Sequence, residues 1–174
     1  KVSYSAFYGC SNLESISLPN CSYIEAGAFQ YCYSLKSISI PNAITVSSSV
    51  FFYCSSLSNI DMPKTQKLGE YAFYTCSNLE NASIPLASNI LTRTFEMCSS
   101  LSKFICENAT NIYPYVFSRC NNLSELYLYT NSIIKLNNSN VFTSTPMVDS
   151  SYLGYYGSIY VPNDLLDSYK SATN

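Results

Sequence analysis

The stretch AFYGCSNLESISLP, residues 6–19, recurs along the chain with constant spacing. AFQYCYSLKSISIP begins at residue 28 and VFFYCSSLSNIDMP begins at residue 50, each 22 residues after the stretch before it. In six successive copies, phenylalanine is followed after three residues by cysteine and after three more by leucine. Self-similarity at such a fixed period predicts a solenoid, in which each repeat forms one coil that packs on its neighbours.

The aligned apolar positions form columns that run through all the copies. The first three columns are Phe7, Phe29, Phe51, Phe73, Phe95 and Phe117; Cys10, Cys32, Cys54, Cys76, Cys98 and Cys120; and Leu13, Leu35, Leu57, Leu79, Leu101 and Leu123. A further column runs through Val2, Ile24, Val46, Leu68, Ile90, Ile112 and Ile134. One coil cannot bury enough apolar surface to offset the entropy of ordering its backbone, so the coils must share one core.

Within a copy, the alternation of apolar Ile16 and Leu18 with serine predicts a strand with one buried face. Stacked copies then give a parallel sheet. Pro19 follows the strand and has no N–H to donate, so it marks the edge of the sheet. Phe7 and Cys10 lie three residues apart, which predicts a short helical or 3-10 turn on the opposite side. Because turns are bulkier than strands, we expect the stack to curve with its sheet on the inside.

The spacing of Leu13, Ile16, Leu18 and Cys21 fits the leucine-rich repeat template. More specifically, the run F-x-x-C-x-x-L-x-x-I-x-I/L-P resembles the BspA-like leucine-rich repeats of bacterial and protist surface proteins, over residues 2–142. The resemblance implies a leucine-rich-repeat solenoid with a curved parallel β-sheet on its inner face and short helical or 3-10 turns and loops on its outer face. The chain departs from the pattern at Glu107 and Tyr129, where the proline after the strand is missing.

The repeat pattern divides the chain into two parts. We predict a solenoid over residues 1–142, whose first residues belong to the end of a repeat because Val2 occupies the last apolar column. Residues 143–174 are predicted to form an atypical last repeat and a C-terminal cap that includes a helix. Asn163 is the expected N-cap of that helix. Its apolar side, expected to cover the open end of the stack, consists of Leu165, Leu166 and Tyr169.

The composition argues against several classes of function. The chain has no histidine, the commonest general base and metal ligand, and its carboxylates are spread over different coils. We therefore expect no enzymatic activity, no catalytic residue and no cofactor. Nine Lys and Arg residues are scattered in a chain of net charge −2, so nucleic acid is not an expected partner. No run reaches 18 apolar residues, so this fragment is not expected to insert into a membrane.

Eight cysteines in 174 residues would ordinarily suggest disulfides or a metal site. Six of them, however, fall in one column, which makes a row along the stack rather than a tetrahedral cluster. Stacked side chains also point in parallel directions, which is poor geometry for a disulfide. We therefore predict buried free thiols that pack as small apolar groups, and no metal site.

The outward strand positions suggest a binding surface in the later coils. The first four coils carry mostly serine and asparagine there, whereas the next two carry Ile105, Tyr127 and Tyr129. The charged neighbours of these residues are Lys103, Glu107 and Glu125. Exposed aromatic residues with a charged rim are typical of protein-binding hot spots, so these six residues are the candidate binding patch. Lys103 and Glu125 are also expected to form a cross-strand ion pair. The alternative is that the pattern drifts near the cap, where residues 152–156 cover the rings.

These observations favour a non-catalytic binding module that acts through its inner sheet face. The resemblance implies a secreted or cell-surface microbial protein that adheres to host proteins, host cells or other microbes, and therefore an extracellular location. We expect a monomer whose partner is a host or microbial surface protein. Two other hypotheses remain open: a structural spacer that projects another domain from the cell surface, and a glycan-binding module that uses tyrosine and asparagine on the sheet.

Overall fold

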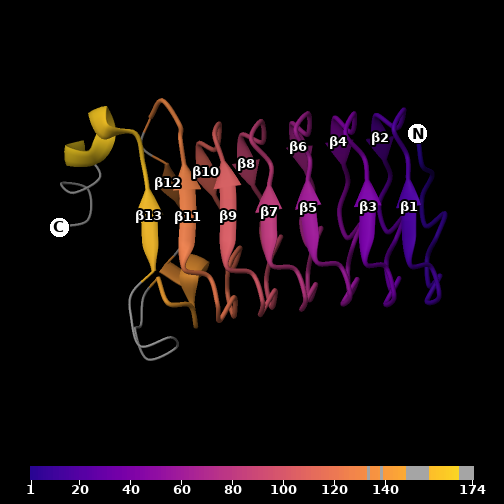
Figure 1. The fold of residues 1–174 in the computed structure, drawn as a ribbon. Coiled ribbons are helices and arrows are strands. Elements are labelled where there is room, and N and C mark those ends of the chain that lie inside the picture. Colours follow the sequence, from indigo (N-terminus) through magenta and orange to yellow (C-terminus); the bar gives the residue numbers. More distant parts are fainter. Residues whose placement is uncertain (133, 138, 148–156, 169–174) are drawn as a thin grey trace.

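The computed structural model describes residues 1–132, 134–137, 139–147 and 157–168, which form a stack of coils (Figure 1). Each coil gives one strand to a front sheet and a shorter strand to a rear sheet. The front strands are β1 (Ser15–Ser17), β3 (Ser37–Ser39), β5 (Asn59–Asp61), β7 (Asn81–Ser83), β9 (Lys103–Cys106), β11 (Glu125–Leu128) and β13 (Ser158–Tyr160). The rear strands are β2 (Tyr23–Ile24), β4 (Thr45–Val46), β6 (Lys67–Leu68), β8 (Asn89–Ile90), β10 (Asn111–Ile112) and β12 (Lys135–Leu136).

All strand pairs are parallel, and most of them keep the 22-residue register of the sequence. Ile16 lies beside Ile38, and Ala82 lies beside Phe104, as the column alignment requires. The prediction of a parallel-sheet leucine-rich-repeat solenoid is therefore confirmed. The rear strands were not predicted as strands, although their buried residues are those of the last apolar column. In the last coil the register shifts: Leu136, not Ile134, pairs with Ile112, while the side chain of Ile134 is the buried one. The domain boundary at residue 142 stays a prediction.

The phenylalanine column forms the centre of the core. Neighbouring rings stack almost in parallel, with centroids 5.0–5.9 Å apart, from Phe7 through to Phe142. Phe29, Phe51, Phe73, Phe95 and Phe117 have no exposed surface. In the column of inward strand residues, a small side chain lies beside a large one: Ala82 pairs with Phe104 and leaves room for its ring. The Phe104 ring contacts Phe95 and Phe117 edge-on. Stacked rings of this kind contribute stability beyond the area that they bury.

The Phe-x-x-Cys segments are successive hydrogen-bonded turns whose bonds span three residues, in line with the short helical or 3-10 turns that we expected. The N–H of each cysteine donates to the carbonyl of the phenylalanine three residues earlier, as Cys54 does to Phe51 at 3.0 Å. Among the described residues, only the segment of the last coil, η1 (Ser139–Phe142), is a 3-10 helix of this series. Two positions per coil have positive φ, but glycine occupies them only at Gly9 and Gly27. Tyrosine, serine, threonine, arginine and methionine fill the others, so the positive φ angles could not be predicted from the residue types.

The cysteine column makes a regular set of contacts between coils. The thiol of each buried cysteine donates to the phenylalanine carbonyl of the preceding coil, as Cys76 does to Phe51 at 3.1 Å. The same contact is made by Cys32, Cys54, Cys98 and Cys120, at 3.0–3.1 Å. All eight cysteines are free thiols, as predicted, but Cys10 is exposed rather than buried. Five phenylalanine carbonyls thus accept two hydrogen bonds each, one from their own turn and one from the next coil; they are those of Phe7, Phe29, Phe51, Phe73 and Phe95.

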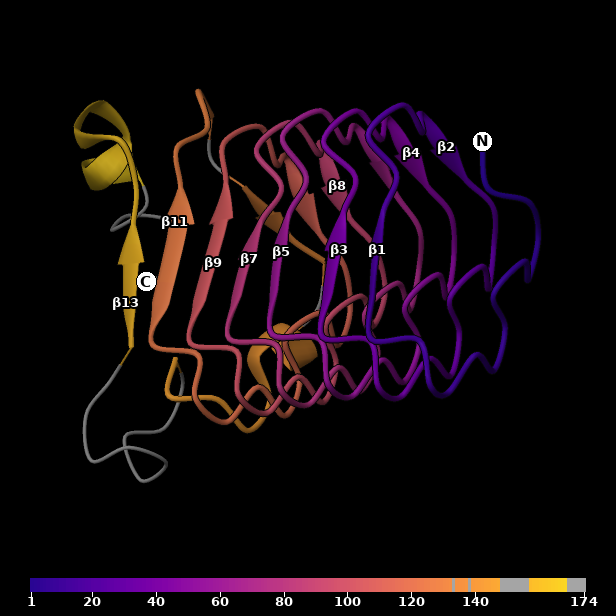
Figure 2. The same ribbon diagram turned by 45° about the vertical axis from the view of Figure 1, so that its right-hand side comes forward.

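Each sheet is interrupted once. The front sheet divides between β3 and β5, and the rear sheet divides between β6 and β8. In Figures 1 and 2, β3 and β5 lie visibly further apart than other neighbouring front strands. The N–H groups of Met62 and Ile84 donate to Ser83 and Ile105 in the next coil, but that of Ile40 makes no such bond to Asp61. In the coil that contains β5 and β6, the front strand β5 therefore pairs with β7 of the following coil, whereas the rear strand β6 pairs with β4 of the preceding coil.

Gly69 marks a close backbone approach at the rear of this coil. It follows β6, and a Cβ atom at this position would lie 2.3 Å from the backbone nitrogen of Ser48 in the preceding coil. A glycine without a Cβ lets the rear of its coil approach the coil before it, and the rear sheet is interrupted on the other side of β6. The aligned residue one coil earlier is Ser47, which has a Cβ atom.

The C-terminal end differs from the predicted cap. After β13 comes η3 (Asn163–Leu165), continued by helical residues 166–168. Asn163 was expected to cap this helix, but Pro162 occupies the N-cap and makes no side-chain capping bond. Leu166 is 42% exposed, so it does not cover the stack, and Tyr169 lies outside the described residues. No helix in the described part of the chain is long and apolar enough to cross a membrane.

Candidate functional site

The candidate patch lies where the front sheet is longest. Where proline follows a strand, the ladder ends, but Glu107 and Tyr129 replace it and still carry an N–H. The backbone N–H of Glu107 donates to the carbonyl of Pro85, and the backbone N–H of Tyr129 donates to the carbonyl of Cys106. Strands β9 and β11 accordingly have four residues, whereas the other front strands have three. Because β9 and β11 are not followed by proline, the sheet continues for one more hydrogen bond at each strand. The patch side chains therefore lie on or directly after regular strands.

The patch contains a charged contact across β9 and β11. Lys103 pairs in register with Glu125, and their Nζ and Oε2 atoms are 3.8 Å apart, as the predicted ion pair requires. The Nζ atom of Lys103 also lies 4.5 Å from the ring centroid of Tyr127, a cation–π contact. The Tyr127 hydroxyl donates to Oε2 of Glu125 at 3.2 Å. The side chains of these three residues are thus in mutual contact.

Tyr160 of β13 adds an aromatic ring that the sequence analysis did not assign to the patch. It pairs in register with Tyr127, and the two rings stack at 4.3 Å with an angle of 5°. Burial and the hydrogen bond to Glu125 raise the pKa of Tyr127 to about 12, so its hydroxyl stays a donor at neutral pH. Tyr160 could have been found in the sequence, because SIYVP at residues 158–162 reproduces the end of a strand followed by proline.

The remaining patch residues are available at the surface. Tyr129 is 47% exposed and contacts the Tyr127 ring at 5.8 Å, Glu107 is exposed, and Ile105 is half-buried beside Tyr127. The structure thus brings Lys103, Ile105, Glu125 and Tyr127 together on one face, with Tyr129 next to them. Residues 152–156, which were expected to cover these rings in the alternative interpretation, lie outside the described residues.

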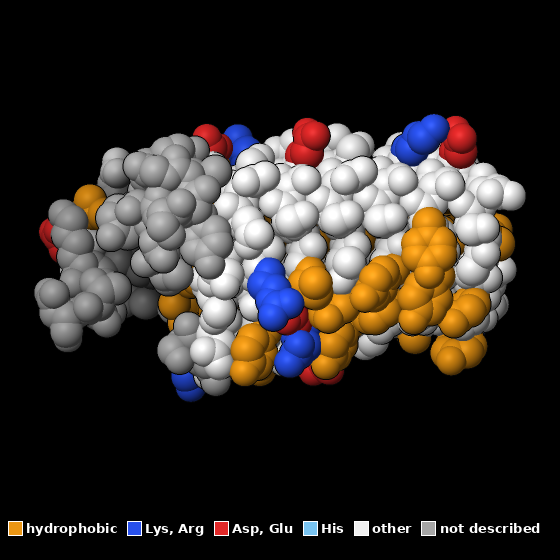
Figure 3. Space-filling view, turned by 90° about the horizontal axis from the view of Figure 1, so that it is seen from below, with side chains coloured by type: hydrophobic (Ala, Val, Ile, Leu, Met, Phe, Trp, Pro, Cys, Tyr) orange, Lys and Arg blue, Asp and Glu red, His pale blue; other side chains and the backbone are white. Residues whose placement is uncertain are grey.

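The turn side of the stack carries a second set of rings. The rings in contact with one another here are those of Tyr8, Tyr31, Tyr33, Phe52, Tyr53, Tyr71 and Tyr74. Figure 3 shows a band of hydrophobic side chains on this side, nearer the N-terminal end, followed by basic and acidic side chains. Packing among the rings themselves accounts for this band, because each ring covers part of the next.

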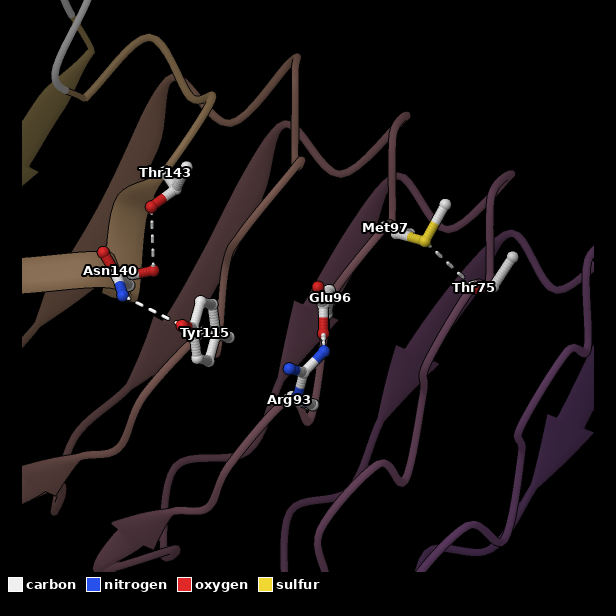
Figure 4. Close-up of polar contacts among 7 residues, drawn as sticks. All are labelled: Thr75, Arg93, Glu96, Met97, Tyr115, Asn140 and Thr143. Carbon is white, nitrogen blue, oxygen red and sulfur yellow. Dashed lines mark hydrogen bonds and ion pairs between the residues drawn. The ribbon is translucent and has the colours of Figure 1, made fainter. Parts of the chain in front are cut away.

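Further along the turn side, polar contacts replace the rings (Figure 4). Arg93 pairs with the largely buried carboxylate of Glu96 at 2.6 Å, and its guanidinium lies 4.6 Å from the Tyr115 ring centroid. The Tyr115 hydroxyl accepts a hydrogen bond from Asn140 at 3.0 Å. These groups connect three successive coils on the outside of the stack, and each is occupied by its neighbours.

Several buried cysteine thiols are held in an unreactive form. Burial raises the pKa of the Cys32 and Cys106 thiols to about 11, and it also raises the pKa of the Cys76 thiol well above its usual range. Thiols in this state stay protonated at neutral pH and are poor nucleophiles and poor metal ligands. In the part of the chain that the structure describes, no three cysteine or carboxylate side chains are grouped so that they could hold a metal ion.

Comparison with known proteins places these features in a family. The family model for the BspA type leucine rich repeat region matches this chain in six copies, over residues 1–124 and 45–154. The crystal structure of the leucine-rich repeat protein TpLRR from T. pallidum matches with a TM-score of 0.72 at 24% identity. The match covers 91% of this chain and 78% of that one. A search of curated proteins found no match.

Two further crystal structures are similar. A leucine-rich repeat protein from Eubacterium ventriosum has a TM-score of 0.64 at 18% identity, over 79% of this chain and 44% of that one. A leucine rich cell surface protein from Faecalibacterium prausnitzii has a TM-score of 0.53 at 22% identity, over 74% of this chain and 41% of that one. At these identities the likeness shows the fold alone.

Proposed function

Because the chain belongs to the BspA-type leucine-rich repeat family, we propose that it is a non-catalytic protein-binding module that acts through its front sheet. The partner is a protein on a host or microbial surface, and the module belongs to a secreted or surface-attached microbial protein. The similarity to a leucine rich cell surface protein supports this location. Adhesion through direct protein contact is the corresponding biological role.

One observation supports the position of the site: exposed aromatic and charged side chains collect on the front sheet at β9, β11 and β13. Tyr127, fixed between Lys103 and Tyr160, is a rigid anchor that loses little entropy on binding. Tyr129 and Glu107 provide exposed contacts around it. Rigid aromatic anchors with a polar rim are the usual source of affinity in protein interfaces.

The test is a binding assay with matched variants. The labelled protein is applied to an array of extracellular matrix proteins and to cultured epithelial cells, and the Ile105→Ser/Tyr129→Ser variant is compared with it. The variant should lose at least about tenfold in affinity, because truncation of hot-spot residues typically costs 2 kcal/mol or more. Tyr33→Ser is the control, since Tyr33 is as exposed as Tyr129 (both 47%) but lies on the turn side.

The outcomes separate the three hypotheses. Equal binding by both variants and the parent protein would contradict a site at the patch. A spacer predicts no saturable binding by any of the three proteins. A glycan-binding module predicts that binding to cells disappears after enzymatic removal of their surface glycans, while binding to unglycosylated matrix proteins is absent from the start.

A further inference from the structure

The division of the front sheet creates a cleft well away from the aromatic patch. Its volume is about 450 Å³, and it lies between β3 and β5, where the strands separate in Figures 1 and 2. The lining residues are Ile38, Ser39, Ile40, Pro41, Asn59, Ile60, Asp61, Pro63 and Asn81. The cleft opens on the face that the proposed function uses for binding.

The floor and the rim of this cleft differ in chemistry. Ile38, Pro41 and Pro63 supply apolar surface, and Ile38 is only half-buried although it is an inward strand residue, whereas Ile40 and Ile60 also line the cleft but are almost fully buried. The exposed rim consists of Ser39, Asn59 and Asp61. The cleft therefore suits a ligand that has an apolar stem and a polar head.

Asp61 gives the rim its charge. The other outward strand positions of the first four coils are Ser15, Ser17, Ser37, Ser39, Asn59, Asn81 and Ser83, all of them neutral. Asp61 is exposed and takes part in none of the ion pairs among the described residues. In the regular sheet register, the N–H of Ile40 would donate to the backbone carbonyl of Asp61, but this hydrogen bond is not formed. A carboxylate and an unused carbonyl thus lie at the mouth of the cleft.

We infer that the cleft between β3 and β5 receives an arginine side chain of the protein partner. The methylene groups of an arginine would lie on the apolar floor while its charged head stays at the rim. Its planar guanidinium carries five donors, enough to bind both oxygens of the Asp61 carboxylate and the adjacent carbonyl. This inference rests on the proposed function, because it assumes that a protein binds the front sheet.

The inference can be tested without knowing the partner. The 15N-labelled protein is titrated with the peptide acetyl-Gly-Arg-Gly-amide, and the control peptide contains citrulline, which has the shape of arginine without its charge. The arginine peptide should produce saturable shifts in the amide signals of Ile40, Asp61 and their strand neighbours. Asp61→Asn should weaken this binding about tenfold, because hydrogen bonds to charged groups are stronger than neutral ones. Asp164→Asn, which removes an exposed carboxylate near the C-terminus, should leave it unchanged.

The inference is overturned if the arginine peptide gives no saturable shift, if citrulline binds equally well, or if Asp61→Asn binds like the parent protein. None of these results bears on Ile105 and Tyr129, whose variants test the proposed function in a separate assay. Conversely, loss of the proposed function at β9 and β11 would leave the peptide titration of the cleft unaffected.

Discussion

At the scale of single residues, the cysteine column shows how one weak interaction becomes structural when it is repeated. A thiol is a poor donor, but in this stack it faces a phenylalanine carbonyl whose second lone pair is unused. Five such contacts of 3.0–3.1 Å connect successive coils. The site is fully buried and admits only a small side chain, so cysteine supplies both the right volume and a donor. The sequence predicted the burial of this column but not its hydrogen bonds.

Replacement of Cys76 by alanine tests this contact. The variant loses the contact to the Phe51 carbonyl and leaves a small cavity in a fully buried position, so we expect it to be about 1–2 kcal/mol less stable. Cys10→Ala removes the exposed member of the same column and should change stability by less than about 0.5 kcal/mol. Urea unfolding of both variants measures the difference. Equal stability of the two would show that the thiol contact contributes nothing.

The raised pKa of the buried thiols predicts how the free energy of unfolding depends on pH. Burial raises the pKa of Cys32 and Cys106 to about 11, whereas an unfolded thiol titrates near about 8.5. Between these values the unfolded chain has released its protons and the folded chain still holds them, so rising pH favours unfolding. Stability should be complete below about pH 8 and should decline as the pH rises toward about 11. Unfolding curves across this range should show a shallower decline of stability with pH for Cys32→Val than for the parent protein. An identical decline would show that the Cys32 thiol does not contribute to this pH dependence.

At the scale of strands and turns, one coil stands out because both sheets are interrupted next to it. Gly69 allows its coil to lie directly against the backbone of Ser47 and Ser48, and the front and rear sheets are interrupted on opposite sides of that coil. A repeat protein is expected to add equal coils at equal spacing, because each coil contacts only its neighbours. In this stack the regularity is interrupted at the coil of Gly69, and a cleft lies in the front sheet between β3 and β5.

Gly69→Ala should therefore be costly. Its Cβ would lie 2.3 Å from the Ser48 nitrogen, so the backbone must move, and we expect a loss of about 3 kcal/mol, at the upper end of overpacking effects. Ser47→Ala at the aligned position is the control and should be nearly neutral. Thermal unfolding compares the variants, and amide signals of Ile40 and Asp61 report whether the cleft changes shape. A fully stable Gly69→Ala protein would contradict the close approach.

Prediction from the sequence succeeded where side-chain size and period carry the information. The 22-residue columns predicted the front strands, their parallel register and the core residues, because each column must keep its chemistry to pack on its neighbours. The rear strands are only two residues long, too short for an alternating pattern to show. The divided sheet was not foreseen because it concerns the backbone spacing between coils, which the side-chain columns do not encode. In the patch, the Lys103–Glu125 pair was predicted from alignment, whereas the Tyr127–Tyr160 stack required the position of β13.

At the scale of the whole molecule, stability is a sum of contacts between neighbouring coils, and the coil is the unit that can be removed. Deletion of residues 29–50 joins Ala28 to Phe51 and keeps every column in phase. We expect this shortened protein to fold cooperatively, with a smaller denaturant m-value because less surface is exposed on unfolding. Deletion of residues 29–39 removes half a coil and puts strand residues opposite turn residues, so that protein should not fold. Circular dichroism and urea titration distinguish the two proteins. If both deletions unfold the chain equally, register between coils is not what holds the stack together.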